Sequence, residues 1–197
     1  MKDIFTYIYK HNVWGGTESV SGTGSSVHES QQLINKLPSL LTLFEIKSIL
    51  DAPCGDFNWM KHVSLPSTTN YTGIDIVAEL IIKNNKMFKK ENIEFLENSI
   101  VNDPLPYADL IVCRDALVHF TFEDIFNAIQ NFKRSKSVYL LTTHFPSLMK
   151  NEEIHTGDWR PLNLCLYPFY FPEPIVSIKE TLSIKTMSLW EIKNLDI

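Results

Sequence analysis

Two carboxylates follow short apolar segments in the first half of the chain. Ile49-Leu50 precedes Asp51 and a Pro53-Cys54-Gly55 turn, and the apolar residues 71–74 precede Asp75. A strand, an acidic turn and a helix in succession place a ligand at the carboxyl ends of a parallel sheet. In dinucleotide-type sites, an acid about 20 residues after such a turn binds the ribose hydroxyls. The pattern therefore predicts a nucleoside-type ligand with Asp75 on its ribose; the alternative is an α/β strand end with no ligand.

Further groups that could do chemistry follow two later strands. Arg114-Asp115 comes directly after the expected strand 109–113, and His144 comes directly after the expected strand 138–143. A hydroxyl nucleophile needs a positioned base, and histidine has a suitable ordinary pKa of roughly 6.5. We expect Asp115 or His144 to be this base. The alternative makes Asp115 a helix-start partner and His144 a packed polar side chain.

His119 lies four residues after Asp115, so on a helical turn the two side chains share a face. We expect it to pack beside the site or to contact the substrate. A metal pocket formed by Asp115, His119, His144 and Asp158 is conceivable, but no HxxH or HxE spacing supports it. We therefore expect no metal.

The segment 156–163 brings together side chains that suit a sugar. Asp158 and Arg160 can form bidentate hydrogen bonds with hydroxyl groups, and Trp159 offers an aromatic face. We expect these three residues to bind the substrate. The alternative is a salt-bridged loop that only stabilises the fold.

The elements that must position these residues alternate between strands and helices. We expect strands at 48–51, 71–74, 93–96, 109–113, 138–143, 175–180 and 188–192. We expect helices from the Ser26 cap to about Lys36, a short one ending before Glu45 because Pro38 intervenes, and others at 58–63, at 77–89 and after the Thr121 cap. This order predicts an α/β fold with a seven-stranded, mostly parallel sheet, a C-terminal antiparallel hairpin and helices on both faces.

Residues 1–25 are rich in glycine and hydroxyl groups, a composition typical of linkers. The indole of Trp14 and the aromatic residues before it are unusual in a linker. Glycines also suit backbone that lies against a ligand. We therefore expect residues 1–25 to cover the cofactor as a lid on a single domain spanning 1–197.

Composition excludes several classes of function. The chain has 197 residues and a net charge of −5, which would repel a nucleic-acid backbone. We expect no membrane span and no signal peptide, because no apolar run approaches the necessary length. The three cysteines lack zinc spacing and are expected to be reduced thiols of a cytoplasmic protein.

The two acidic segments resemble the first two motifs of class I S-adenosylmethionine (SAM)-dependent methyltransferases. The first motif of that family usually reads apolar-apolar-Asp/Glu-x-Gly-x-Gly-x-Gly; here Gly55 remains, while Pro53 and Phe57 stand at the outer glycine positions. The resemblance implies a Rossmann-like fold and methyl transfer from SAM with S-adenosylhomocysteine (SAH) as product. An acid often follows the third strand beside the adenine in this family, and here Ser99 stands there. The implied cofactor contacts are Trp14, Ser25, Asp51, Cys54, Gly55, Asp75, Ile76, Ser99, Ile100 and Arg114.

The motifs Asp-Ala-Pro-Cys-Gly-Asp-Phe-Asn-Trp-Met, Cys-Arg-Asp and Thr-Gly-Asp-Trp-Arg-Pro-Leu-Asn resemble a compact subgroup of bacterial and large-virus methyltransferases. Some of its members look like domains joined to glycosyltransferases. This resemblance implies O-methylation of a sugar or glycan hydroxyl, with a terminal deoxysugar as one plausible acceptor. Two alternatives stay open: transfer to an amine or carboxylate of a small molecule or peptide, and SAM binding without turnover.

Overall fold

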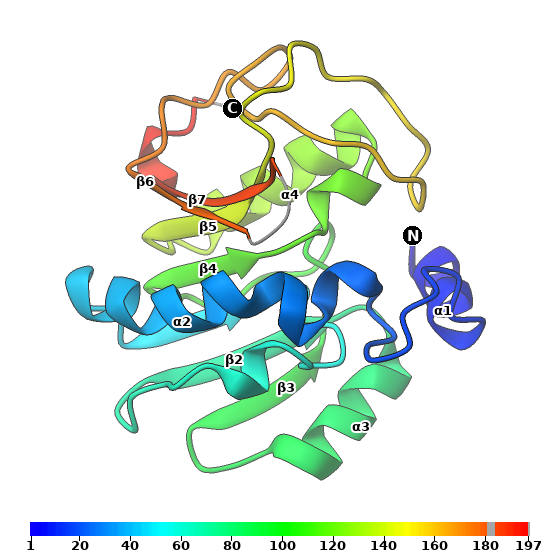
Figure 1. The fold of residues 1–197 in the computed structure, drawn as a ribbon, viewed down its shortest axis with the longest axis vertical. Coiled ribbons are helices and arrows are strands. Elements are labelled where there is room, and N and C mark those ends of the chain that lie inside the picture. The colour runs from blue at the N-terminus through cyan, green and yellow to red at the C-terminus, as the bar shows by residue number, and fades with distance from the viewer. Residues whose placement is uncertain (181–183, 197) are drawn as a thin grey trace.

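A single seven-stranded sheet forms the centre of the computed structural model, which describes residues 1–180 and 184–196 (Figure 1). Its strand order is β3-β2-β1-β4-β5-β7-β6. The first five strands in this order run parallel to one another, whereas β7 runs antiparallel to both β5 and β6. The strands are β1 (Ser48–Asp51), β2 (Asn70–Asp75), β3 (Ile93–Glu97), β4 (Leu110–Cys113), β5 (Tyr139–His144), β6 (Val176–Lys179) and β7 (Thr186–Glu191). The predicted fold class is confirmed, and each strand ends within about two residues of its expected bounds.

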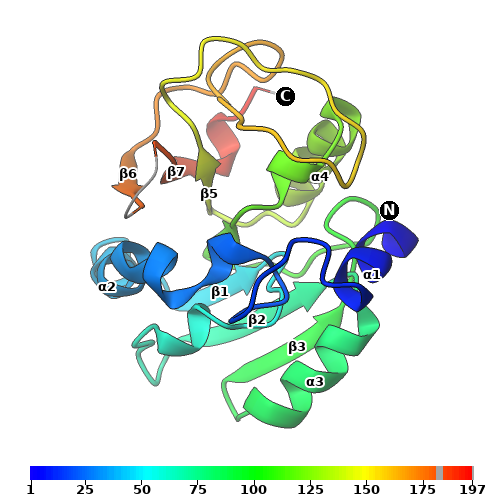
Figure 2. The same cartoon turned by 45° about the vertical axis from the view of Figure 1, so that its right-hand side comes forward.

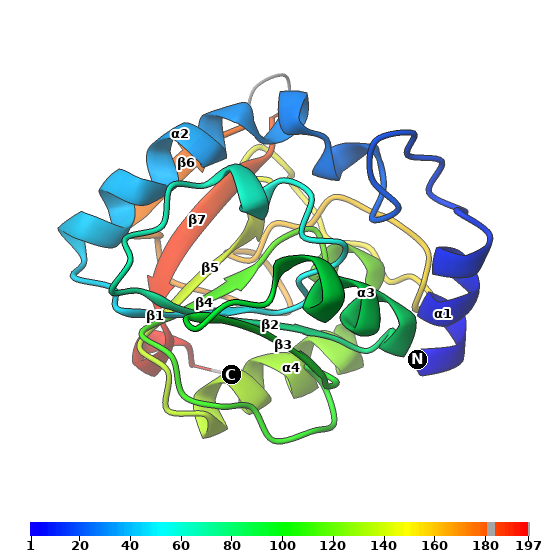
Figure 3. The ribbon, with the colours of Figure 1, turned by 90° about the horizontal axis from the view of Figure 1, so that it is seen from below.

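Four α-helices surround this sheet among the described residues: α1 (Lys2–Lys10), α2 (Val27–Leu43), α3 (Ala78–Phe88) and α4 (Phe122–Arg134). Helices α2 and α4 lie on opposite faces of the sheet (Figure 3). Each face has its own apolar core, one containing the buried side of α2 and the other that of α4. Strand β4 is buried at every position because it is covered on both faces.

Both predicted N-caps are confirmed. The Ser26 hydroxyl accepts a hydrogen bond from the Glu29 amide at 3.3 Å, and the Thr121 hydroxyl accepts one from the Asp124 amide at 3.1 Å. Each cap satisfies an amide that has no partner inside its helix. These caps fix where α2 and α4 begin.

The predicted break at Pro38 is wrong, because α2 continues through this proline to Leu43. A proline inside a helix costs roughly 3 kcal/mol. The apolar stripe Leu33, Leu37, Leu40 and Leu41 keeps its spacing across Pro38 and is buried along its whole length. Burial of this stripe outweighs the lost hydrogen bond.

Two other helix predictions need correction. The expected helix 58–63 is only a 3₁₀ turn at Met60–His62. Helix α1 was not predicted at all, although Ile8 is buried and Phe5 packs against the core of the α4 face. It lies beside α3 at the carboxyl ends of β2 and β3 (Figure 2), where Lys10 pairs with Glu79 at 2.8 Å.

The long connection between β5 and β6 contains no helix or strand. It is held instead by side-chain hydrogen bonds to its own backbone. The Asn151 amide group donates to the carbonyls of Asn163 and Tyr167, each at 2.8 Å. This connection brings Trp159 towards the carboxyl edge of the sheet, where it meets the groups that follow β4.

Within the described residues, no helix has the length and apolar character needed to cross a membrane. The three cysteines are free thiols. Cys54 and Cys113 are buried, as expected, and Cys165 is partly exposed.

Candidate active site

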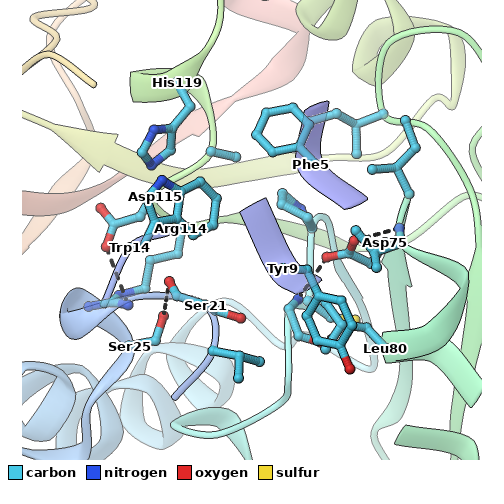
Figure 4. A pocket seen from close by; sticks show the side chains of 18 of the residues that line it. Phe5, Tyr9, Trp14, Ser21, Ser25, Asp75, Leu80, Arg114, Asp115 and His119 are labelled. Atoms are coloured by element: carbon cyan, nitrogen blue, oxygen red, sulfur yellow. Dashed lines mark hydrogen bonds and ion pairs between the residues drawn. The ribbon is translucent and has the colours of Figure 1, made fainter. Parts of the chain in front are cut away.

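A cavity of about 920 Å³, counted to its open mouth, lies at the carboxyl ends of β1 to β4 (Figure 4). It is called here the inner cavity, and this volume includes solvent space at its mouth. Residues of α1 and of the segment 14–25 close it from the other side. Its lining includes Met1, Phe5, Tyr9, Trp14, Ser21, Ser25, Cys54, Gly55, Asp75, Ile76, Ser99, Ile100, Arg114, Asp115 and His119.

The inner cavity collects nearly all the residues that the sequence pointed to as cofactor contacts. Trp14, Ser25, Cys54, Gly55, Asp75, Ile76, Ser99, Ile100 and Arg114 line it, and Asp51 does not. Their contact with SAM stays a prediction, but their convergence at one sheet edge follows from the parallel topology. Met1, Phe5, Tyr9 and Ser21 were missed. A helical spacing of Phe5, Ile8 and Tyr9 was the available signal for the first three.

Asp51 is buried behind the inner cavity. Its Oδ2 accepts a hydrogen bond from the Tyr71 hydroxyl at 2.6 Å, and no protein group bonds its buried Oδ1. Burial raises the pKa of Asp51 to about 7, against the opposing effects of Tyr71 and Arg114. The prediction that Asp51 borders the ligand directly is therefore not supported by its position.

Asp75 ends β2 and faces the inner cavity. It accepts hydrogen bonds from the amides of Val77 at 2.9 Å and Gly55 at 3.1 Å. Burial raises the pKa of Asp75 to about 6, although both amides act in the opposite direction. Each carboxylate oxygen has a second lone pair. These lone pairs leave capacity to accept hydrogen bonds from ribose hydroxyls, and that contact stays a prediction.

The segment 14–25, called here the cover segment, is bonded to the turn that follows β1. The Asp56 carboxylate accepts hydrogen bonds from the Ser19 hydroxyl and the Val20 amide, both at 3.0 Å. The Asp56 amide donates to the Ser21 hydroxyl at 3.1 Å. Asn58 donates to the Ser25 carbonyl at 3.1 Å. These hydrogen bonds hold the cover segment against the turn that carries Gly55.

The packing of the cover segment explains why Gly55 is the glycine of the usual methyltransferase motif that this chain keeps. Gly55 has a φ of +52°, and a Cβ atom there would lie 2.3 Å from the Ser21 hydroxyl oxygen. Phe57, at an outer glycine position, instead turns into the core, where its ring lies 5.1 Å from those of Tyr71 and Phe95. The motif therefore keeps glycine at the position whose backbone lies closest to the cover segment.

A second, outer cavity of about 1,540 Å³ adjoins the first and is open to solvent. The two cavities share Trp14, Ser21, Asp115 and His119, so these four residues form the junction between them. The outer cavity presents a half-exposed indole, Trp159, among hydroxyl-bearing residues of the cover segment. Its other lining residues include Thr17, Glu18, Ser19, Thr23, Ser26, Glu29, Phe145 and Lys185.

Four charged side chains form a balanced cluster at the junction. Arg114 donates to the Glu180 carboxylate at 2.9 and 3.0 Å and to the Gly24 carbonyl of the cover segment at 2.7 Å. Lys185 pairs with Asp115 at 2.7 Å and with Glu180 at 2.8 Å. Glu180 and Lys185 were not predicted, because only the pairing of β6 with β7 brings them to this place.

Asp115 is held as an anion by the positive charges beside it. Burial acts to raise its pKa, but Arg114, 3.4 Å away, and Lys185 lower the pKa of Asp115 to about 2. The Thr143 hydroxyl also donates to its Oδ1 at 3.1 Å. A carboxylate this stable as an anion is a weak base, so the expectation that Asp115 removes a proton is not supported.

His144 lies away from both cavities. It is 3% exposed, its Nδ1 accepts the Leu164 amide at 3.2 Å, and its ring packs edge-on against Trp190. Burial lowers the pKa of His144 to about 4. The position of His144 does not support the prediction that it is catalytic, because this side chain lines neither cavity.

His119 lies at the junction, at the end of the 3₁₀ turn Leu117–His119. Its Nδ1 is 2.8 Å from the Asp158 carbonyl oxygen, and its ring stacks on Trp14 at 4.6 Å. Burial lowers the pKa of His119.

The three residues expected to hold a sugar have different positions. Trp159 lines the outer cavity, 59% exposed, whereas Asp158 is exposed and lines neither cavity. Arg160 is buried and donates to the carbonyls of Leu117, Phe120 and Glu152 at 2.8–3.1 Å. Its guanidinium is bonded to these backbone carbonyls, so its position does not support the prediction that Arg160 binds substrate. In the described part of the chain, no three His, Cys, Asp or Glu side chains group as a metal site would require.

A sequence profile described as "Methyltransferase domain" matches residues 49–136. No curated protein matches the chain. Among solved structures, magnesium protoporphyrin IX methyltransferase from Synechocystis PCC 6803 with bound SAH is 13% identical, covers 83% of each chain and has a TM-score of 0.58. Human N-acetylserotonin methyltransferase in complex with SAM is 18% identical with a TM-score of 0.57, and the alignment covers 88% of this chain and 58% of that one.

The methyltransferase domain of bacterial CtHen1-C is 15% identical with a TM-score of 0.52. That alignment covers 58% of this chain and 65% of the other. The chain thus spans less than two thirds of two of these three structures. At these identities the solved structures show only that this chain shares their fold. The profile match covers the segment from β1 to α4.

Proposed function

We propose that the chain, whose residues 49–136 match a methyltransferase-domain profile, is a SAM-dependent enzyme that methylates a hydroxyl group of a sugar or glycan. The inner cavity holds SAM, and the outer cavity holds the acceptor. The observation that carries this proposal is the junction, where two cavities of different character share Trp14, Ser21, Asp115 and His119.

The residues of the inner cavity fit the cofactor. Gly55 leaves space at the turn after β1, and Asp75 can accept hydrogen bonds from the ribose hydroxyls. Ser99 and Ile100 would border the adenine, and Arg114 closes the wall beside the junction. When bound, SAM supplies an electrophilic methyl carbon activated by the sulfonium. The chain contributes alignment of the two partners and exclusion of water by the cover segment.

The outer cavity favours an uncharged, hydroxyl-rich acceptor. An exposed indole such as Trp159 offers a flat apolar face to a sugar ring, and the hydroxyl groups of Thr17 and Thr23 are available around it. The open shape accommodates the end of a longer glycan. A carboxylate acceptor is less favoured, because Glu18 and Glu29 also line this cavity.

A panel of acceptors with SAM tests the proposal. The panel contains methyl glycosides of neutral hexoses and 6-deoxyhexoses, together with small amines, carboxylic acids and short peptides. The readout is the gain of one CH₂ by mass spectrometry and the matching release of SAH. We expect gain on the glycosides. Transfer confined to amines or carboxylates would contradict the sugar assignment, and SAM binding without transfer to any acceptor would contradict turnover.

Two variants locate the acceptor. Trp159→Ala should raise the acceptor KM by roughly 3- to 10-fold, the value of an aromatic contact of about 0.5–1.5 kcal/mol. Tyr167→Ala is the matched control, since Tyr167 is an exposed aromatic of the same connection that lines neither cavity. Equal KM values in both variants would remove the outer cavity as the acceptor site.

A further inference from the structure

We propose that His119 is the general base that removes the proton from the acceptor hydroxyl. This inference rests on the proposed function, because a sugar hydroxyl has a pKa far above 7 and gains from proton removal as its oxygen attacks. His119 lies where the two cavities meet, so its ring borders both the expected methyl donor and the expected acceptor. Figure 4 shows its imidazole pointing from the 3₁₀ turn towards the cavity, next to Asp115.

The hydrogen bond of the ring fixes its tautomer. The Asp158 carbonyl oxygen can only accept, so Nδ1, 2.8 Å away, must carry the hydrogen. In the neutral imidazole Nε2 then has the free lone pair. A general base needs this arrangement, with one nitrogen held by a fixed acceptor and the other available.

Packing fixes the orientation of the ring. Trp14 stacks on the imidazole at 4.6 Å with an interplanar angle of 27°. Arg160 holds the turn beneath it by donating to the carbonyls of Leu117 and Phe120. The Gly157 amide donates to the His119 carbonyl at 2.8 Å, so the segment carrying Asp158 is bonded to the same turn. Arg160 is thus a positioning residue in place of the substrate contact that its sequence context suggested.

Burial keeps the His119 ring neutral near pH 7, with a lone pair that can accept a proton. Burial is the main influence and lowers its pKa, Arg160 acts in the same direction, and Asp115 and the Asp158 carbonyl act against it. The cover-segment side chain that contacts the His119 ring is the uncharged indole of Trp14. Of the other candidates, Asp115 is a weak base and His144 is out of reach, so His119 is the titratable group at the junction that suits proton removal.

The proton transfer balances without another reactant. The acceptor O–H bond breaks and its electron pair stays on oxygen. As this oxygen forms a bond with the methyl carbon, the carbon–sulfur bond of SAM would break and its electron pair would stay on sulfur, which gives SAH. The proton forms a bond with the Nε2 lone pair, giving an imidazolium beside Asp115. This imidazolium returns the proton to water through the open outer cavity.

The test compares His119→Asn with the wild type. Asparagine keeps a side-chain donor for the Asp158 carbonyl but has no basic nitrogen. We expect kcat/KM for the methyl glycoside that the wild type uses to fall by about 10²- to 10⁴-fold, with the SAM dissociation constant within about threefold. The wild-type pH profile should lose activity only below about pH 6.5, and the variant should lack this acid limb.

A second readout is independent of turnover. Nitrogen-15 NMR of the histidines in the SAM-free protein should show one ring, absent in His119→Asn, that is protonated at Nδ1 when neutral and titrates below pH 6.5. His155→Asn is the matched control, because His155 is an exposed histidine of the segment that carries Asp158.

The outcomes separate the two proposals. Glycoside methylation by His119→Asn at the wild-type rate, or a ring protonated at Nε2, would overturn His119 as the base while leaving the sugar methyltransferase intact. Absence of methylation of any glycoside by the wild type would overturn the proposed function itself. A loss of activity in His155→Asn equal to that in His119→Asn would show that the effect is not specific to the junction.

Discussion

Replacing Gly55 by alanine tests whether the cover segment belongs to the cofactor site. The new methyl group would lie 2.3 Å from the Ser21 hydroxyl oxygen and 3.0 Å from its Cβ, so Ser21 must move by about 1 Å to reach ordinary contact. Gly55 also has a φ of +52°, where a side chain costs about 1–2 kcal/mol. Gly15→Ala is the matched control: its φ is +69°, and a Cβ there meets nothing within 4 Å.

The expected magnitude follows from the contacts that Ser21 anchors. Its displacement breaks the 3.1 Å hydrogen bond from the Asp56 amide and strains the two bonds that Asp56 accepts from Ser19 and Val20. At about 0.5–1.5 kcal/mol for a neutral bond and more for a charged one, the loss is about 2–4 kcal/mol. SAM affinity should therefore fall roughly 30- to 700-fold in Gly55→Ala and hardly change in Gly15→Ala.

Isothermal titration calorimetry with SAM and SAH gives the affinities, and urea unfolding gives the stability of each variant. The double variant Gly55→Ala/Ser21→Gly removes both atoms that clash, so it should bind SAM about as well as Ser21→Gly alone. If Gly55→Ala binds SAM like Gly15→Ala, the cover segment does not close the site. If Ser21→Gly gives no recovery, the added methyl group acts on the ligand directly and the reasoning about the cover segment fails.

Three further predictions use simpler changes. Asp75→Ala should weaken SAM binding roughly 10- to 100-fold, because a hydrogen bond to a carboxylate contributes about 1.5–3 kcal/mol, and unchanged affinity by calorimetry would remove the ribose assignment. Deletion of residues 1–24 should leave a protein that circular dichroism shows to be folded but that retains SAM poorly; normal binding and turnover would make this segment a linker. His144 has a folded-state pKa of about 4 against an ordinary 6.5, so the stability that its neutral form contributes is lost as pH falls from about 6.5 towards 4. Urea unfolding at pH 7 and pH 4.5 should show a loss in the wild type larger than that in His144→Leu by on the order of 2 kcal/mol, and equal losses would refute the assignment.

The apolar periodicity and the N-cap residues predicted most of the fold, because both depend on interactions between residues that are close in the sequence. The apolar runs before Asp51 and Asp75 became β1 and β2, and the caps at Ser26 and Thr121 begin α2 and α4. The error at Pro38 came from applying a local rule where tertiary burial decides. The apolar stripe on both sides of Pro38 was visible in the sequence and indicated the continuous helix.

The candidate site was predictable only where residues follow strand ends. Asp75, Ser99 and Arg114 each follow a parallel strand, so topology brings them to one cavity. His144 also follows a strand, but the 3.2 Å bond from the Leu164 amide and the ring of Trp190 enclose it.

Residues from distant parts of the chain gave no such signal. Glu180 and Lys185 reach the junction through the antiparallel pairing of β6 and β7. The roles of Arg160 and His119 depend on how the segment 155–160 folds onto the 3₁₀ turn, through bonds such as that from the Gly157 amide to the His119 carbonyl. The sequence pattern does not contain these contacts.

The balanced cluster at the junction bears on how the site discriminates between reactant and product. Arg114 and Lys185 carry two positive charges, and Asp115 and Glu180 carry two negative charges. Methyl transfer converts a positively charged sulfonium into a neutral thioether. A wall with excess negative charge would hold the sulfonium more tightly than the thioether and so stabilise the ground state against reaction. With its charges paired, this wall adds little to the preference for SAM over SAH, and the product leaves without an electrostatic penalty from these four side chains.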